Sequence, residues 1–338
     1  MIMENKSVKI LSAKQISIQN PLAEEWMDNP LSYTEDYVRA VDPDFRQFIS
    51  AGDARRMGKL LKRALATSLS ALHEGGIEDP DAIITGTGFG SIENTELFLD
   101  ALVREGEQLL KPTQFMQSTH NTASSLIGIH TKCHGYNSTY SQKGFSFDSA
   151  LYDAWMQFRL GRIRSALVGS HDEMSPVFSG FVRKAGHVKE GEICSEAAVS
   201  VLMTECGDNA YCTLDGVKLL DTPSEVTLKQ VLADMTAGGI NAVMTGMSGN
   251  AENDSWYGFL NTMLSGVPQL RYKPLFGVNF SSSAIGFYAA ACCLRKGCVP
   301  AVLSASGKDI DCRKGILVVN VVEGRHYSFS LLKSVCGK

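Results

Sequence analysis

Residues 134–170 read HGYNSTYSQKGFSFDSALYDAWMQFRLGRIRSALVGS and contain a helix and a strand in close succession. The pattern predicts a helix over residues 146–160, and Gly161 is placed to end it. The apolar run at 165–170 is typical of a short buried strand. A helix that leads directly into such a strand indicates the alternation found in parallel or mixed sheets.

The same alternation occurs upstream of this stretch. Apolar residues at helical spacing predict a helix over residues 54–72, with Asp53 capping its start and a Gly75-Gly76 pair ending it. A buried strand is expected at 82–85, where AIIT leads into the glycine-rich turn GTGFGS.

A second set of elements follows downstream. Strands at 197–205 and 210–220 are predicted to pair around a Gly207-Asp208 turn. Later elements are a helix near 228–236, a strand at 240–246, a helix at 284–295 and two closing strands at 315–322 and 327–332. Because the alternation occurs twice, we expect two similar halves, residues 1–206 and a shortened 207–338.

Composition excludes several classes of protein. A net charge of -4 and the lack of any dense lysine or arginine run argue against a nucleic-acid surface. The first residues lack the apolar core of a secretory signal, and the longest apolar run, near 284–294, is too short for a membrane span. Nine irregularly spaced cysteines predict buried thiols in a reducing compartment. We therefore expect a cytoplasmic protein with no membrane or nucleic-acid partner, no cofactor and no metal.

The glycine turn GTGFGS, residues 86–91, could be taken for a nucleotide-binding loop. However, Ser91 stands where the third glycine of G-x-G-x-x-G belongs, and no acidic residue clearly ends a following strand. A close-packed turn is the favoured interpretation. His171, Asp172 and Glu173, just after the strand at 165–170, are expected to be exposed loop residues.

Two segments resemble β-ketoacyl synthases of the thiolase-like superfamily. PTQFMQSTHNTASSLIG, residues 112–128, is similar to the segment that lines the dimer interface in that family. Residues 134–170 resemble the nucleophile region, because Gly135, Gly161 and Gly169 fall on three family glycines without a gap. The nucleophilic cysteine is then replaced by Gly144, and Ser146 matches the family's serine two places later.

The resemblance also locates the two catalytic histidines of the family. AVMTGMSGNAEND, residues 242–254, puts Thr245 in the first position. KPLFGVNFSSSAIG, residues 273–286, puts Val278 in the second and keeps the family's lysine as Lys273. Only His326 follows His187, so two histidines cannot come from this half of the chain.

The resemblance implies a five-layered α-β-α-β-α thiolase-like fold with mixed sheets, and a dimer. No residue is predicted to be catalytic; Ser146, Lys273 and His120 are the predicted substrate-binding residues, although a structural role at the dimer seam is favoured for His120. Subunits without the cysteine occur in the family as chain-length factors, which pair with an active synthase. The length and the opening ISIQNPL (residues 16–22) are similar to ketosynthase-like proteins of aryl-polyene and flexirubin-type pigment pathways.

Three functions stay open at this stage. The first is a non-catalytic partner of an active ketosynthase that serves an acyl carrier protein. The second is an acyltransferase with another nucleophile, for which Ser146, Cys133 and Cys194 are weak candidates. Ser146 has no obvious neighbouring base, and Cys194 is better explained as a packing residue before a buried strand. The third is a homodimeric module that binds acyl carrier protein or a pigment precursor.

Overall fold

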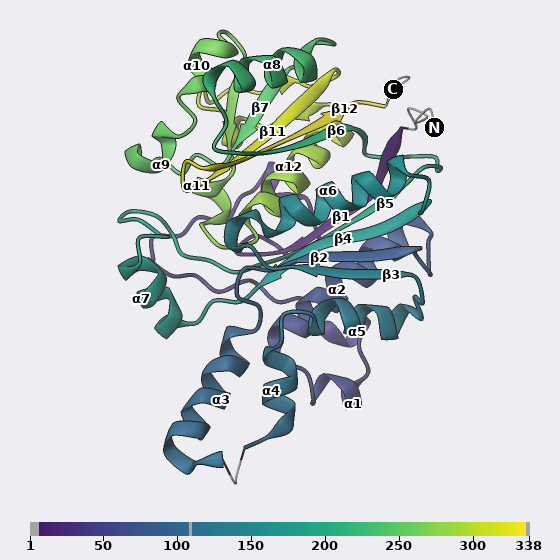
Figure 1. Ribbon diagram of the computed structural model, residues 1–338, viewed down its shortest axis with the longest axis vertical. Helices are drawn as coiled ribbons and strands as arrows, with labels where there is room; N and C mark the ends of the chain where they lie inside the picture. The colour runs from purple at the N-terminus through teal and green to yellow at the C-terminus, as the bar shows by residue number, and fades with distance from the viewer. Residues whose placement is uncertain (1–6, 108–109, 336–338) are drawn as a thin grey trace.

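The computed structural model describes residues 7–107 and 110–335, which form a mixed α/β fold around one large sheet (Figure 1). The sheet has ten strands in the order β3-β2-β4-β5-β1-β6-β12-β11-β7-β8. The first five along the chain are β1 (Val8–Ile16), β2 (Ala82–Gly86), β3 (Tyr136–Tyr140), β4 (Ser165–Asp172) and β5 (Ala197–Thr204). The others are β6 (Cys212–Asp221), β7 (Ala242–Thr245), β8 (Gln269–Arg271), β11 (Gly315–Val322) and β12 (His326–Lys333).

The strand order repeats itself across the centre of the sheet. Outward from the centre, one half runs β1-β5-β4-β2-β3 and the other runs β6-β12-β11-β7-β8. In both halves the two inner pairings are antiparallel and the two outer pairings are parallel. The halves join where Val8–Ile10 of β1 pair with Cys212–Leu214 of β6.

Helices form three layers around these strands. The helices α6 (Ser146–Arg159) and α12 (Ser282–Lys296) lie between the halves and touch strands of both. The helices α2 (Lys59–Gly75) and α5 (Thr122–Thr131) cover the outer face of the first half. The outer face of the second half packs against α8 (Glu225–Thr236) and α10 (Phe259–Met263). The predicted α-β-α-β-α layering is therefore confirmed.

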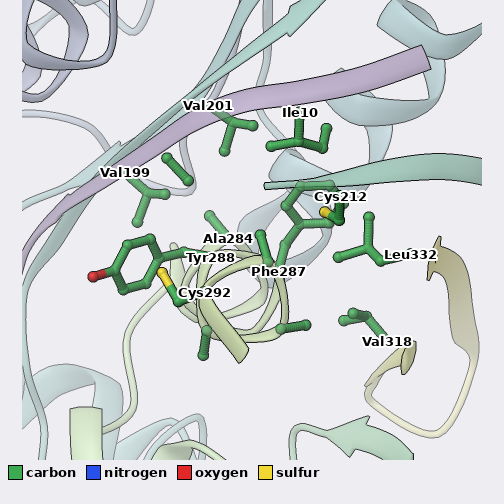
Figure 2. Close-up of a cluster of buried hydrophobic side chains, with 14 of the residues drawn as sticks. Ile10, Val199, Val201, Cys212, Ala284, Phe287, Tyr288, Cys292, Val318 and Leu332 are labelled. Carbon is green, nitrogen blue, oxygen red and sulfur yellow. The ribbon is translucent and has the colours of Figure 1, made fainter. Parts of the chain in front are cut away.

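The helix α12 is the centre of the largest hydrophobic cluster. Every residue from Ser282 to Leu294 is buried, and its alanines and paired cysteines let the surrounding strands approach closely. Figure 2 shows Phe287 and Tyr288 of α12 among side chains of β1, β5, β6, β11 and β12. Burial on all sides explains why this stretch is apolar without a helical stripe.

The prediction of a β5–β6 hairpin was wrong. The strand β1 lies between β5 and β6 and pairs antiparallel with both, so the Gly207-Asp208 turn connects strands that are not neighbours. The helix predicted at 54–72 is also divided into α1 (Ala51–Ala54), capped by Ser50, and α2, which begins at Lys59. Asp53 therefore caps neither helix, whereas Gly76 ends α2 in the left-handed conformation with φ 68°.

The helices α3 (Ile92–Glu105) and α4 (Pro112–Ser118) pack together and project from the body at the lower end of Figure 1. The remaining short elements are α7 (Pro176–Lys184), α9 (Ala251–Ser255), α11 (Lys273–Phe276), β9 (Cys298–Val299) and β10 (Ile310–Asp311). Within residues 7–107 and 110–335, no helix has the length and apolar character needed to cross a membrane.

Candidate functional site

The site begins at the turn between β3 and α6. Gly144 lies in a one-turn 3-10 helix, residues Lys143–Phe145, directly before the first residue of α6. The second half of the chain holds this turn, because Asn320 Nδ2 at the end of β11 donates to the Gly144 carbonyl at 3.1 Å. Lys143 has a left-handed backbone with φ 51°, which is rare for a residue with a side chain.

The turn opens into a cavity of about 110 Å³ between the two halves. Its polar lining includes Lys143, His187, Asn253, Lys273 and Asn320, and its apolar lining includes Met174, Val188, Val278, Phe280 and Val322. A Cβ atom on Gly144 would meet only Val322 Cγ2, at 3.7 Å, which is an ordinary contact. The cavity therefore has room for a side chain at the position where the chain carries none.

Two of the three positions matched to the family's catalytic residues line this cavity, and the third lies next to a lining residue. Gly144 and Val278 line it directly. Thr245, at the end of β7, is buried and donates its hydroxyl to the Leu270 carbonyl at 2.8 Å, so the neighbouring Gly246 faces the cavity instead. At the cavity, Gly144 contributes no side chain and Val278 contributes an apolar one, while the Thr245 hydroxyl is bonded to the Leu270 carbonyl.

Lys273 lies at the start of α11 and reaches the cavity lining beside Gly246. Burial lowers the pKa of its amine, and the charges of Glu192 and Asp254 oppose that shift. Of the three predicted substrate-binding residues, only Lys273 lines this cavity.

Ser146 and His120 lie elsewhere. The Ser146 side chain is fully buried, accepts from the Gln142 N–H at 2.7 Å and lies within donating distance of the Thr87 and Lys143 carbonyls. This bonding is that of a residue that shapes the start of α6. His120 is exposed and lies near the loop at Gly90, among residues of a different and smaller cavity.

Sequence reasoning missed His187, which lines the Gly144 cavity from the loop after α7. Its ring lies 5.9 Å from the ring of Phe280, centroid to centroid, and burial lowers its pKa. His187 matches neither family histidine position, and no local motif marks it. Only the folded arrangement of the loop brings it to the cavity.

The mouth of the cavity carries an ion pair between Lys143 and Glu323. The Lys143 Nζ lies 3.2 Å from Glu323 Oε1, and both side chains are about half exposed. Glu323, in the turn between β11 and β12, also has a left-handed backbone with φ 55°. Two residues in this uncommon conformation thus face each other beside Gly144.

A buried carboxyl group lies one turn into α6. Asp148 accepts from Asn320 Nδ2 at 2.8 Å and from the Ser328 hydroxyl. Burial raises its pKa from the ordinary 3.8 to about 6, against the lowering effect of these hydrogen bonds. Asn320 therefore links this carboxyl group to the Gly144 carbonyl.

The expectation that His171, Asp172 and Glu173 are exposed was wrong, because each is only 1% exposed. Asp172 accepts from the N–H groups of residues 88–90 and from the hydroxyls of Thr87 and Ser281. The amides of the glycine turn are therefore occupied by a carboxylate of the chain itself. A Cβ on Gly86 would lie 2.5 Å from the Ser146 backbone, which confirms the close-packed turn.

Among the residues that the structure describes, no group of three or more histidine, cysteine, aspartate or glutamate side chains could hold a metal ion. The thiols considered as displaced nucleophiles also lie outside the Gly144 cavity. Cys194 is buried with its pKa raised to about 12, and burial raises the pKa of Cys133 as well. Raised values keep a thiol protonated and unreactive.

The family model "Beta-ketoacyl synthase, N-terminal domain" matches residues 24–250, more than half of the chain. The chain belongs to the β-ketoacyl synthase family. Among curated proteins, none matches the sequence.

Solved structures of similar fold include ketosynthases and a chain length factor. One described as "The ishigamide ketosynthase/chain length factor" has a TM-score of 0.81 at 14% identity, over 98% of this chain and 100% of that one. A type II polyketide synthase acyl-carrier protein in complex with its ketosynthase gives a TM-score of 0.80 at 16% identity, over 98% and 100%. A β-ketoacyl synthase from Burkholderia phymatum STM815 gives 0.81 at 13% identity, over 98% and 100%. These likenesses confirm the thiolase-like ketosynthase fold of this family member.

Proposed function

We propose that this β-ketoacyl synthase family member is a non-catalytic subunit that pairs with an active ketosynthase and helps to set the length of its product. The observation that carries the proposal is the cavity at Gly144. Lys273 lines it, while glycine, threonine and valine stand at the positions matched to the nucleophile and the two histidines. A cavity that lacks the nucleophile and both histidines is suited to holding a chain rather than extending it.

We propose the outer edge of the first half as the surface for that partner. The strand β3 ends the sheet, and large apolar side chains are exposed on the neighbouring elements α3, α4, α5 and α6. They include Val103 (84% exposed), Ile129 (74%) and Met116 (65%). A concentration of exposed apolar side chains at a free sheet edge favours a protein interface.

Co-expression with a ketosynthase and acyl carrier protein of the same organism tests this proposal. The tagged chain is expected to copurify with the ketosynthase, and its omission is expected to change product length. We propose that the pathway makes an aryl polyene or a flexirubin-type pigment. Failure to copurify, together with an unchanged product when the chain is omitted, would contradict the proposal.

A pair of single substitutions locates the interface. Ile129→Glu on α5 is expected to weaken copurification, because it places a charge within the proposed contact surface. Val226→Glu on α8 is the matched control, since Val226 is similarly exposed, at 78%, on the opposite outer layer. Equal effects of the two substitutions would place the interface elsewhere.

A further inference from the structure

We propose that Glu173 fastens an arm formed by the helices α3 and α4 to the body of the protein, and that the arm is released when Glu173 loses its proton. This inference concerns the isolated chain. It therefore stands or falls separately from the proposed pairing with a ketosynthase.

The arm has little apolar contact with the body. The helix α3 packs against α4, α4 adjoins α5, and the pair projects from the lower end of the molecule (Figure 1). Of the residues described in α3, Ile92 alone is buried, and every residue of α4 is at least partly exposed. Regions with so few buried apolar contacts open locally more easily than the core. The polar contacts at the base of the arm therefore provide much of its attachment.

Glu173 connects the start of α3 with the start of α2. One carboxyl oxygen, Oε1, accepts from the Leu60 N–H at 2.7 Å, in the first turn of α2. The other, Oε2, accepts from the Ser91 hydroxyl at 3.1 Å and from the Glu93 N–H at 3.3 Å, where α3 begins. The Glu173 N–H donates to the Gly90 carbonyl at 3.2 Å. Because α2 belongs to the body, one side chain spans the joint between the arm and the body.

Negative charge outweighs positive charge around Glu173. The charged groups that face it are Arg63 of α2, Glu93 of α3 and Glu196 beside β5. Burial raises the pKa of Glu173 from the ordinary 4.5 to about 7. The charges of Glu93 and Glu196 add to this rise in pKa, whereas the Leu60 N–H and the Arg63 charge oppose it. Glu173 therefore changes its charge near neutral pH.

The nearby cations are paired with other acids. Arg63 lies 2.9 Å from Glu196 Oε2 and 2.5 Å from Asp42 Oδ1. Arg39 Nη2 lies 2.9 Å from the carboxylate of the first-turn glutamate of α3. Among the described residues, no cation lies within ion-pair distance of Glu173. Ionised Glu173 therefore lacks a counter-ion of its own, which makes its buried charge costly.

The proton of Glu173 thus favours the fastened arm. A protonated Oε2 keeps its contact with Ser91, because a hydroxyl can accept as well as donate a hydrogen bond. When α3 moves away, the carboxyl group reaches water and its pKa returns to the ordinary 4.5. The raised pKa stabilises the fastened state fully below pH 4.5, and this contribution is lost as the pH rises through 7. With these two pKa values, the open fraction should rise about tenfold from pH 6 to pH 8.

Amide hydrogen exchange of the purified full-length chain measures this opening. Protection factors at pH 6 and pH 8, corrected for the intrinsic pH dependence of exchange, are compared for peptides of α3 and α12. Protection of α3 is expected to be lower than that of α12 at both pH values, and to fall about tenfold at pH 8. Equal protection of α3 at the two pH values, or protection equal to that of α12, would overturn the proposal.

Two variants assign the effect to Glu173. Glu173→Gln keeps the size and one acceptor of the side chain but removes its titration, so protection of α3 is expected to be the same at pH 6 and pH 8. Asp148→Asn is the matched control, since it removes a buried carboxyl group of raised pKa from α6, outside the arm. The fall in protection is expected to persist in Asp148→Asn. A fall that also persists in Glu173→Gln would assign the effect to another group, such as His120 near Gly90, and would contradict the proposal.

Discussion

Two buried polar regions of the molecule differ in how their hydrogen bonds are satisfied. Under the glycine turn, the Asp172 carboxylate is bound by three backbone N–H groups and two hydroxyls. Beside Gly246, the buried Tyr272 hydroxyl has no hydrogen-bond partner among the described residues. A satisfied buried network stabilises the fold, whereas an unpaired buried hydroxyl costs free energy. We therefore expect substitutions in the Asp172 region to destabilise the protein far more than removal of the Tyr272 hydroxyl.

Asp172→Ala is expected to give the largest loss of stability. It leaves the N–H groups of residues 88–90 and two hydroxyls without their acceptor, so the free energy of unfolding should fall by about 4 kcal/mol. Urea denaturation measures this change. A fall in the free energy of unfolding of less than about 1 kcal/mol would contradict the stabilising role given to the hydrogen bonds of Asp172.

A pair of glycine substitutions is expected to have the next largest effect. Gly86→Ala should lower the free energy of unfolding by about 3 kcal/mol, because its Cβ would meet the Ser146 backbone at 2.5 Å. Gly144→Ala should change it by less than about 1 kcal/mol, since only Val322 Cγ2 is near, at 3.7 Å. Thermal and urea denaturation of both variants provide the test. Similar losses would mean that the space at Gly144 is not available.

The buried Asp148 predicts a dependence of stability on pH. Its pKa is raised in the folded protein from 3.8 to about 6, so its contribution to stability is present below pH 4 and is lost as the pH rises through 6. Relative to the wild type, Asp148→Asn should therefore gain roughly 2–3 kcal/mol between pH 4 and pH 7. Urea denaturation at both pH values checks this, because other groups cancel in the difference. A constant difference would show that Asp148 titrates normally.

Two tyrosine substitutions sharpen the comparison with the smallest expected effects. Tyr288 accepts from Trp26 Nε1 at 3.0 Å and donates to the Ala23 carbonyl at 3.1 Å. Tyr288→Phe should therefore lower the free energy of unfolding by about 1 kcal/mol, whereas Tyr272→Phe should leave it unchanged or raise it. If Tyr272→Phe is the more harmful of the two, its hydroxyl has a structural partner.

Most of the fold could be predicted from the sequence, because its periodic segments are long and apolar. The helices α6 and α12 and the β11–β12 hairpin all occur where the pattern placed them. The β5–β6 pairing failed because a distant strand, β1, inserts between two strands that are adjacent in sequence. Local turn residues carry no information about such an insertion. The division of the chain at residues 206 and 207 stays a prediction.

The candidate site was only partly predictable. Matching the segments of this chain to those of the family identified Gly144, Val278 and Lys273. The structure places all three in the lining of one cavity. His187 and the two tyrosines beside Gly246, Tyr257 and Tyr272, lie on segments whose positions depend on the packing of the two halves. Their spacing in the sequence therefore could not predict that they lie near the cavity. Burial of Asp172 was missed for the same reason, since its partners are backbone amides of residues 88–90.

Intact-protein mass spectrometry after incubation with an acyl-carrier thioester shows whether this subunit can be acylated. We expect an unmodified mass for the wild-type chain. We expect one added acyl group for Gly144→Cys, whose thiol would stand before α6 in the open cavity. An acyl adduct on the wild-type chain, under conditions that label an ordinary ketosynthase, would contradict the claim that this subunit is non-catalytic.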